Sequence, residues 1–108
     1  PPVVATSLPP PPPAWLTRAF TTAARHYMAG LFEEARTLLI SILEREPAHA
    51  DSLYLLGSVA GQSGDVALAE ALVRQAIAID SSKAIYWVLL GNILQRCERF
   101  EESEVCYQ

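Results

Sequence analysis

The stretch LLGSVAGQSGDVALAEA, Leu55 to Ala71, decides the fold because its composition and its glycines point in opposite directions. Leucine and alanine favour a helix, yet Gly57, Gly61 and Gly64 interrupt it, and a glycine inside a helix costs about 1 kcal/mol relative to alanine. Gly64 can take the left-handed conformation that ends a helix, and Asp65 can cap the amides of the next one. The stretch therefore predicts two helices joined by a tight turn.

The same pattern recurs along the chain at a fixed interval of 34 residues, the separation of Gly57 from Gly91. Sliding the sequence against itself by this interval places small residues on small ones and large apolar residues on large apolar ones. The aligned sets are Gly57 with Gly91, Leu56 with Leu90, Leu53 with Trp87, Gly30 with Gly64, Phe32 with Val66 and Phe100, Ala35 with Ala69 and Ser103, and Leu38 with Leu72 and Cys106. So many matches in one register indicate a repeated structural unit.

Apolar residues spaced three and four apart predict a helix on each side of every turn in the repeat. Pro47 stops one helix, and Ser81 or Ser82 can cap the helix that follows the second unit. Two helices that cross closely require a residue without bulk at the crossing, so we expect Gly57 to face Ala69. The predicted helices are Trp15–Ala29, Phe32–Arg45, Ala50–Ser63, Val66–Ile79, Ala84–Cys97 and Phe100 to the end.

Residues 1–14, PPVVATSLPPPPPA, differ in character from the rest of the chain. Consecutive prolines lack amide donors and favour polyproline II, so this segment is predicted to be an extended arm. It is either a ligand for a groove that recognises PxxP motifs or a semi-rigid spacer, and both interpretations stay open. Residues 15–108 are predicted to form one array, with units at about 16–49, 50–83 and 84–108, the last of them cut short.

Charge and composition argue against several classes of function. The formal net charge of −4 makes a nucleic-acid partner unfavourable, because phosphate binding rests on lysine and arginine. No apolar run reaches the roughly 20 residues of a membrane span, so no membrane partner is expected. The two cysteines, Cys97 and Cys106, form no metal-ligand motif and favour a reducing, cytoplasmic setting. Because the chain starts on Pro1 and stops within a predicted helix, we interpret it as a piece of a longer protein.

Catalysis finds no support in the sequence. No GxxxxGK, HExxH or GxSxG motif is present, and no cofactor or metal is predicted. Of the two histidines, His26 falls at a position where the repeat asks for a core-facing residue and His49 falls in a loop, so a structural role is the better interpretation of both. We therefore expect that the chain is not itself an enzyme.

These residues resemble the tetratricopeptide repeat (TPR) family. The family places a bulky residue, a leucine–glycine pair and another large residue on the first helix of each unit, then small and aromatic residues and a proline along the second. The second unit matches with Leu53, Leu56, Gly57, Ala69 and Ala76, and the third with Trp87, Leu90, Gly91, Leu94, Phe100 and Tyr107, whereas the first departs at Ala23 and His26. The resemblance implies an all-α fold of antiparallel helical hairpins stacked as a right-handed solenoid.

In TPR proteins the first helices line a concave wall that holds a peptide, so the resemblance implies a peptide-binding groove here. Phe20, Tyr27 and Tyr54 form an aromatic row that suits either a groove or packing between helices. Asn92 and Arg96 suit either a grip on a peptide backbone or an acidic residue, or a solvated helix face. The predicted groove residues are Phe20, Ala24, Tyr27, Met28, Tyr54, Ser58, Gly61, Gln62, Val88, Asn92, Gln95 and Arg96, with Thr17, Asp51 and Ile85 on the same wall.

We therefore predict a protein-interaction module that binds a segment of a partner in this groove. Gly61 is expected to leave room for the ligand, and alanine at Phe20 and Tyr54 is expected to abolish binding without unfolding. Two alternatives stay open. The chain also resembles the TPR regions ahead of bacterial glycosyltransferases similar to O-GlcNAc transferases, as a substrate-selecting arm, and its size suits a three-repeat secretion chaperone. Self-association through the incomplete last helix, around residues 105–107, is a further hypothesis.

Overall fold

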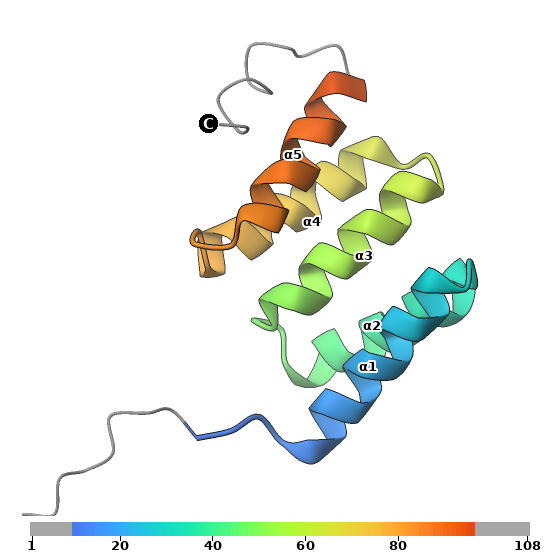
Figure 1. Ribbon diagram of the computed structural model, residues 1–108, viewed down its shortest axis with the longest axis vertical. Helices are drawn as coiled ribbons and strands as arrows, with labels where there is room; N and C mark the ends of the chain where they lie inside the picture. Colours follow the sequence, from blue (N-terminus) through green and yellow to red (C-terminus); the bar gives the residue numbers. More distant parts are fainter. Residues whose placement is uncertain (1–9, 97–108) are drawn as a thin grey trace, which may run out of the picture.

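The computed structural model describes residues 10–96, which form five α-helices and, within this range, no strand. The helices are α1 (Ala14–Met28), α2 (Phe32–Arg45), α3 (Ala50–Gln62), α4 (Val66–Ile79) and α5 (Ala84–Arg96) (Figure 1). The predicted all-α fold is confirmed. None of the described helices combines the length and the apolarity that crossing a membrane requires. The helix predicted from Phe100, and the roles predicted for Cys97, Cys106 and residues 105–107, lie outside the described residues.

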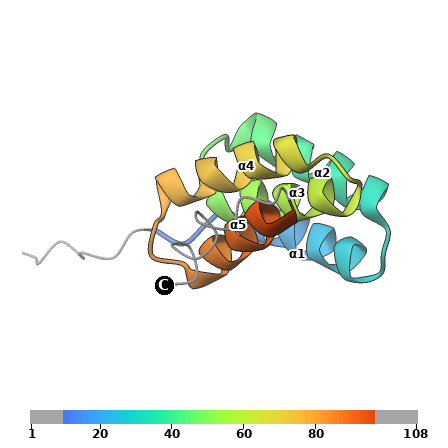
Figure 2. The ribbon, with the colours of Figure 1, turned by 90° about the horizontal axis from the view of Figure 1, so that it is seen from above.

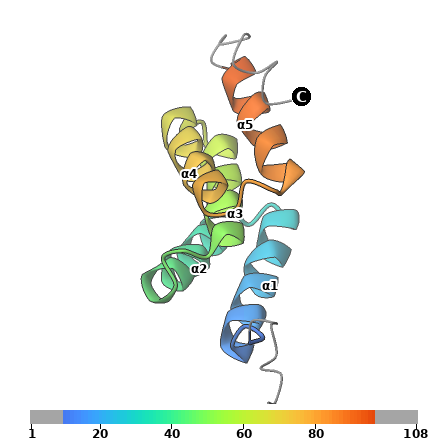
Figure 3. The same cartoon turned by 90° about the vertical axis from the view of Figure 1, so that its left-hand side faces the viewer.

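The helices form two layers of a right-handed solenoid. α1 and α2 pair as one antiparallel hairpin, α3 and α4 form the next, and α5 opens the third unit. Figure 2 shows α2 and α4 in one layer and the first helices, α1, α3 and α5, in the other. Figure 3 shows that α1 and α5 flank α3 on the same side of the molecule. The first helices of all three units therefore share one face, as the groove prediction requires.

Glycine and aspartate make the turns within the hairpins. Gly30 and Gly64 have φ angles of +79° and +88°, the left-handed conformation that lets a chain leave a helix without strain. The Asp65 carboxylate then accepts a hydrogen bond from the Leu68 amide at 3.2 Å and caps α4. The turn predicted at Gly64 and Asp65 is confirmed, and α2 and α4 have the predicted bounds.

Ser82, one of the two serines predicted as a cap for α5, is engaged by Asp80 in the turn that precedes the helix. Its amide donates a hydrogen bond to the Asp80 carboxylate at 3.0 Å, and its hydroxyl donates to the same oxygen at 2.5 Å. These two bonds hold the pKa of Asp80 below its ordinary value. An aspartate two residues before an amide readily closes such a turn, so the serine is engaged before the helix begins at Ala84.

Two apolar clusters form the core of the described residues, one at each junction between units. The first joins α1, α2 and α3, and the second joins α3, α4 and α5. The fully buried aromatic residue of the second cluster is Tyr86. The repeat pattern assigns the bulky position to its neighbour Trp87, which is only half-buried. The Trp87 Nε1–H donates a hydrogen bond to the Ser81 carbonyl at 2.8 Å. The clusters contain Leu16, Ala23, Ala35, Leu39, Ile42, Leu55 and Val59, and Leu53, Ala60, Ala69, Leu72, Val73, Ala76, Tyr86, Leu90, Ile93 and Leu94.

The crossing of α3 and α4 depends on the absence of a side chain at Gly57. A Cβ atom at this position would lie 3.3 Å from the Ala69 carbonyl oxygen and 3.5 Å from the Leu72 Cβ. Because the nearest atom belongs to the backbone of α4, a side-chain rotation cannot relieve the contact. The predicted apposition of Gly57 and Ala69 is confirmed.

Replacing Gly57 with valine is expected to destabilise the fold by about 1–3 kcal/mol, since the added methyl groups force α3 and α4 apart. Urea unfolding followed by circular dichroism measures the change. Gly61→Ala is the matched control on the same helix, because a Cβ there meets its neighbours only at ordinary contact distances of 3.5 and 3.8 Å. Equal stability of Gly57→Val and the parent chain would contradict the close-crossing explanation.

Candidate functional site, a pocket on the first helices

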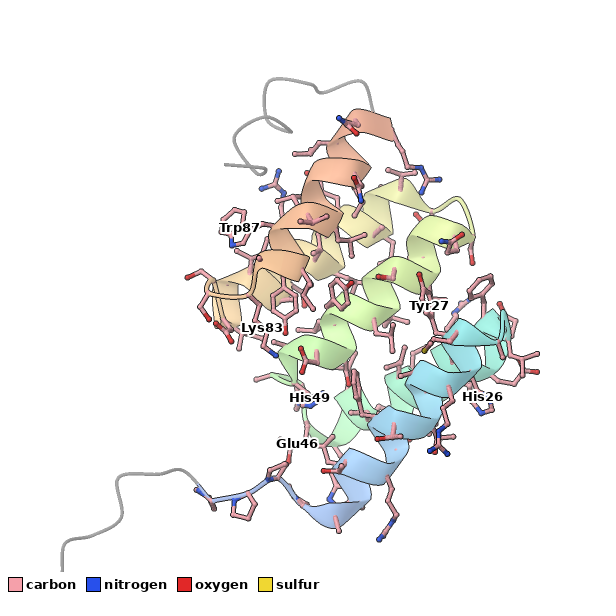
Figure 4. The ribbon with its side chains drawn as sticks, viewed as in Figure 1. His26, Tyr27, Glu46, His49, Lys83 and Trp87 are labelled. Carbon is pink, nitrogen blue, oxygen red and sulfur yellow. The ribbon has the colours of Figure 1, made fainter. Side chains whose placement is uncertain are left out.

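A pocket of about 230 Å³ lies where the C-terminal halves of α3 and α5 meet the end of α1. Figure 4 shows Tyr27 beside α3 at this place. The floor includes the half-buried Leu89 and the buried Ile93, and polar side chains of α3 and α5 surround it. We call this the first-helix pocket; it is lined by Tyr27, Ser58, Gly61, Gln62, Leu89, Asn92, Ile93 and Arg96.

The pocket brings together half of the predicted groove residues. Tyr27, Ser58, Gly61, Gln62, Asn92 and Arg96 line it. Leu89 and Ile93 are missing from the prediction because one repeat earlier their counterparts, Leu55 and Val59, are core residues. In the sequence the two residues share the apolar character of Leu55 and Val59, so nothing local to the third unit marks them as lining a pocket.

Arg96 spans the pocket from α5 to α3. Its Nη1 donates a hydrogen bond to the Gly61 carbonyl oxygen at 2.9 Å, and a Cβ at Gly61 would lie 3.5 Å from the same nitrogen. We expected the absence of a side chain at Gly61 to leave room for a ligand. The guanidinium of Arg96 occupies that room instead. Glycine is useful here because a larger side chain would crowd the arginine that joins the two helices.

The aromatic row packs within the protein. Phe20, Tyr27 and Tyr54 are each half-buried, and each faces another ring. The pairs are Phe20 with His49 at 5.4 Å between centroids, Tyr27 with Phe32 at 5.6 Å, and Tyr54 with Tyr86 at 5.3 Å. Of the two interpretations, packing between helices accounts for Phe20 and Tyr54. Alanine at these two positions would remove core contacts as well, so the pair does not separate binding from folding as the sequence led us to expect.

The other predicted groove residues lie around the pocket without lining it. Ala24 is half-buried on α1, and Met28 at the end of α1 is 85% exposed. Val88 and Gln95 are exposed on α5. Ser58 lines the pocket, but its hydroxyl donates to the Tyr54 carbonyl of its own helix at 3.2 Å. Gln62, Asn92 and Arg96 are the exposed polar side chains that line the pocket.

A second polar cluster lies at the other end of the first helices, where α3 and α5 begin. One oxygen of the Asp51 carboxylate accepts a hydrogen bond from the Lys83 ammonium at 2.8 Å and another from the Tyr86 hydroxyl. Burial raises the pKa of Asp51, but these hydrogen bonds outweigh it and hold the pKa below its ordinary value. Burial and then the same carboxylate raise the pKa of Tyr86. Asp51, expected on the groove wall, instead joins the second unit to the third.

His49 occupies the corresponding place at the junction of the first two units (Figure 4). Its Nδ1 and the Ser52 hydroxyl share a hydrogen bond of 2.6 Å, and its ring stands edge-on to Phe20. Burial lowers the pKa of His49, against the opposing pull of Asp51 and Glu46. The structural role predicted for this histidine agrees with its contacts.

The first comparison with known proteins concerns the family. The sequence model described as Tetratricopeptide repeat matches residues 50–83, which is the range predicted for the second unit. None of the curated proteins matches the sequence.

Solved structures share the arrangement of helices. The Yersinia enterocolitica type III secretion chaperone SycD, in complex with a peptide of the translocator YopD, superposes with a TM-score of 0.81 at 16% identity over 88% of this chain and 72% of that one. MamA from Desulfovibrio magneticus gives 0.80 at 18% identity, over 88% and 54%. A Thermobaculum terrenum O-GlcNAc transferase variant gives 0.84 at 27% identity, over 86% of this chain but only 18% of the transferase. The chain thus spans about half of MamA and a small part of the transferase.

The structure predicts that stability falls in two separate windows as the pH is lowered. The folded-state pKa of His49 lies below the ordinary 6.5, so its contribution is present above pH 6.5 and is lost as the pH falls through the folded-state pKa. The Asp51 contribution is present above its ordinary pKa of 3.8 and is lost only at lower pH. His49→Asn, which keeps a polar partner for Ser52, should flatten the first window, while the second persists because it depends mainly on the Lys83 and Tyr86 hydrogen bonds to Asp51. Thermal melting at a series of pH values measures both, and an unchanged slope in the variant would contradict the assignment.

Proposed function

We propose that this chain, which belongs to the tetratricopeptide repeat family, is a protein-interaction module that holds a segment of a partner protein in the first-helix pocket. The observation that carries the proposal is that one pocket is built by the first helices of all three units. A site assembled in this way forms only when the units stack, because no single hairpin supplies all of its residues.

The chemistry of the pocket suits a peptide. Its apolar floor at Leu89 and Ile93 offers burial to one side chain, since about 230 Å³ is the scale of a residue and below that of a drug-sized ligand. The rim supplies amide groups at Gln62 and Asn92 that both donate and accept, as a peptide backbone requires. Arg96 adds donors and a positive charge, which favours an acidic residue next to the buried one.

The structural neighbours support the same class of function. SycD, which has this fold, was solved with a peptide of its translocator bound. At 16% identity that likeness concerns the fold and carries no residue-level information about the ligand. Binding of a partner segment is therefore the function that fold and pocket favour together.

Selecting peptides against the chain tests the proposal. A random peptide library displayed on phage is panned over the immobilised protein, and affinities of the selected peptides are measured by calorimetry for the parent chain and for Asn92→Trp, which fills the pocket. We expect binding to weaken by about tenfold or more, the effect of losing roughly 1.4 kcal/mol. Arg96→Ala should weaken peptides that carry an acidic residue more than those that lack one.

Gln75→Trp is the matched control, because Gln75 is exposed on α4 in the other layer. It carries the same added indole at a distance from the pocket and should leave the affinities unchanged. Selected peptides that bind Asn92→Trp and the parent chain equally would contradict the pocket assignment, provided that circular dichroism shows both to be folded.

Two further roles are compatible with this function. The chain corresponds to 18% of an O-GlcNAc transferase at 27% identity, which supports a substrate-selecting arm of a larger enzyme, and the full reading frame tests this by showing whether a nucleotide-sugar-binding domain follows. Coverage of 72% of SycD supports a small chaperone. In either case we propose that these residues bind a partner and do not catalyse a reaction. We also propose that nucleic acid is not a partner, because the net charge is −4, and that the setting is cytoplasmic.

The boundary between arm and array is also part of the proposal. We place the arm at 1–14 and the array at 15–108, although α1 begins at Ala14. Residues 10–13 are exposed, and Pro13 has φ −57° and ψ 144°, the polyproline II conformation. This geometry suits a spacer and a PxxP ligand equally.

A further inference from the structure

The two junctions between units contain the same kinds of apolar contact. At the first junction Leu39 of α2 and Leu55 of α3 belong to one buried cluster, and at the second junction Val73 of α4 and Leu90 of α5 belong to another. Each junction also contains one pair of aromatic rings. Apolar contact is non-directional, so it holds helices together without fixing how they slide. A difference in rigidity between the junctions is therefore expected to follow their polar contacts.

Hydrogen bonds fix the second junction at both ends of α5. At the start of the helix, the Asp51 carboxylate of α3 accepts hydrogen bonds from the Lys83 ammonium, at 2.8 Å, and from the Tyr86 hydroxyl. At the end of the helix, Arg96 Nη1 donates to the Gly61 carbonyl at 2.9 Å. Hydrogen bonds weaken steeply away from their preferred distance and angle, so contacts at both ends of one helix oppose sliding and rotation. The second and third units, α3, α4 and α5, therefore form one rigid block.

The first junction is held differently. In the part of the chain that the structure describes, no side-chain hydrogen bond or ion pair joins the first hairpin, α1 and α2, to the second. Thr17 of α1 stands at the repeat position of Asp51 and carries no carboxylate. His49 stands at the repeat position of Lys83, and its hydrogen bond is with Ser52 of its own unit. The counterpart of the Asp51 contact is thus replaced by a contact within one unit.

The counterpart of the Arg96 contact has changed as well. Gln62 stands at the repeat position of Arg96, and its shorter side chain is exposed. Tyr27 stands at the repeat position of Gly61, and its ring packs on Phe32 of the same hairpin with 5.6 Å between centroids. Tyr27 is therefore held by the first hairpin and moves with it.

The first-helix pocket lies across the boundary between the first hairpin and the rigid block. All of its lining residues belong to α3 and α5 except Tyr27, which belongs to α1. Figure 3 shows α1 and α5 on the same side of α3. A displacement of the first hairpin therefore changes the width of the pocket at Tyr27, while the rest of the lining keeps its shape.

We infer that the first hairpin is a movable wall of the first-helix pocket, which slides against the rigid block and carries Tyr27 toward the pocket and away from it. Small sliding of packed helices is the shear type of conformational change, and an interface without directional contacts permits it. The use of this motion to admit and hold a partner segment rests on the proposed function. The motion itself depends only on the contacts between the described residues.

Residual dipolar couplings test the inference, because they average over the microseconds to milliseconds in which packed units move collectively. They are measured for the backbone N–H and Cα–Hα bonds of the ligand-free chain, weakly aligned in a stretched gel. We expect α3, α4 and α5 to fit one alignment tensor, and α1 with α2 to fit a second tensor whose magnitude is reduced by the motion. A single tensor that fits all five helices equally well would overturn the inference.

The cause is tested by removing the hydrogen bonds of the second junction. Asp51→Asn combined with Arg96→Ala should release α5 from the rigid block, so that its couplings no longer fit the tensor of α3 and α4. Should this variant fail to fold by circular dichroism, Arg96→Ala alone keeps the Asp51 contacts and should show a smaller loss of alignment in α5. Couplings of α5 that still fit the rigid block in the folded variant would overturn the proposal, because the two junctions would then not differ through these bonds.

Arg18→Ala is the matched control, because Arg18 is an exposed arginine on α1 and belongs to neither set of hydrogen bonds. It should give the same two tensors as the parent chain, and loss of the difference between them in this variant would count against the explanation. A peptide library that yields no binder would contradict the proposed function, whereas these couplings are measured without a ligand and decide the motion separately.

Discussion

The structure depends on one close contact, that of the α3 backbone at Gly57 with the Ala69 carbonyl of α4. A hairpin that crosses this tightly brings large apolar residues from both helices into one layer, and that layer is what the neighbouring units cover. The fully buried alanines at positions 23 and 35 show that in the first unit a methyl group is still small enough at the corresponding crossing. Because these positions carry no bulky side chain, the two helices of each hairpin lie close together. This close approach sets the spacing of the array and the position of the pocket on the first helices.

The sequence predicts the helices well and the helix faces less well. Gly64, Asp65 and Pro47 are local signals whose effect does not depend on distant residues, so the bounds of α2 and α4 follow from them. Ser82 shows the limit of such signals, since Asp80 competes for the same groups at even shorter range. A face of a first helix is harder to assign, because the groove wall and the stacking surface lie side by side on it.

This ambiguity explains which site residues could be found in advance. Phe20, Tyr54 and Asp51 point toward the following unit and are used in its junction, although their spacing suits a groove equally. Leu89 and Ile93 look like core residues and yet line the pocket. They occupy the positions of the core residues Leu55 and Val59, so the helix that carries them gives no sign that a pocket opens beside them.

The hydrogen bond from Arg96 to the Gly61 carbonyl connects the pocket to the packing of the second and third units. It joins the C-terminal ends of α3 and α5, so it contributes to the packing angle between the second and third units. A ligand group that binds the guanidinium competes with the Gly61 carbonyl for it, so ligand binding and this hydrogen bond oppose each other. A ligand that recruited the Arg96 guanidinium would therefore also alter the contact between the second and third units.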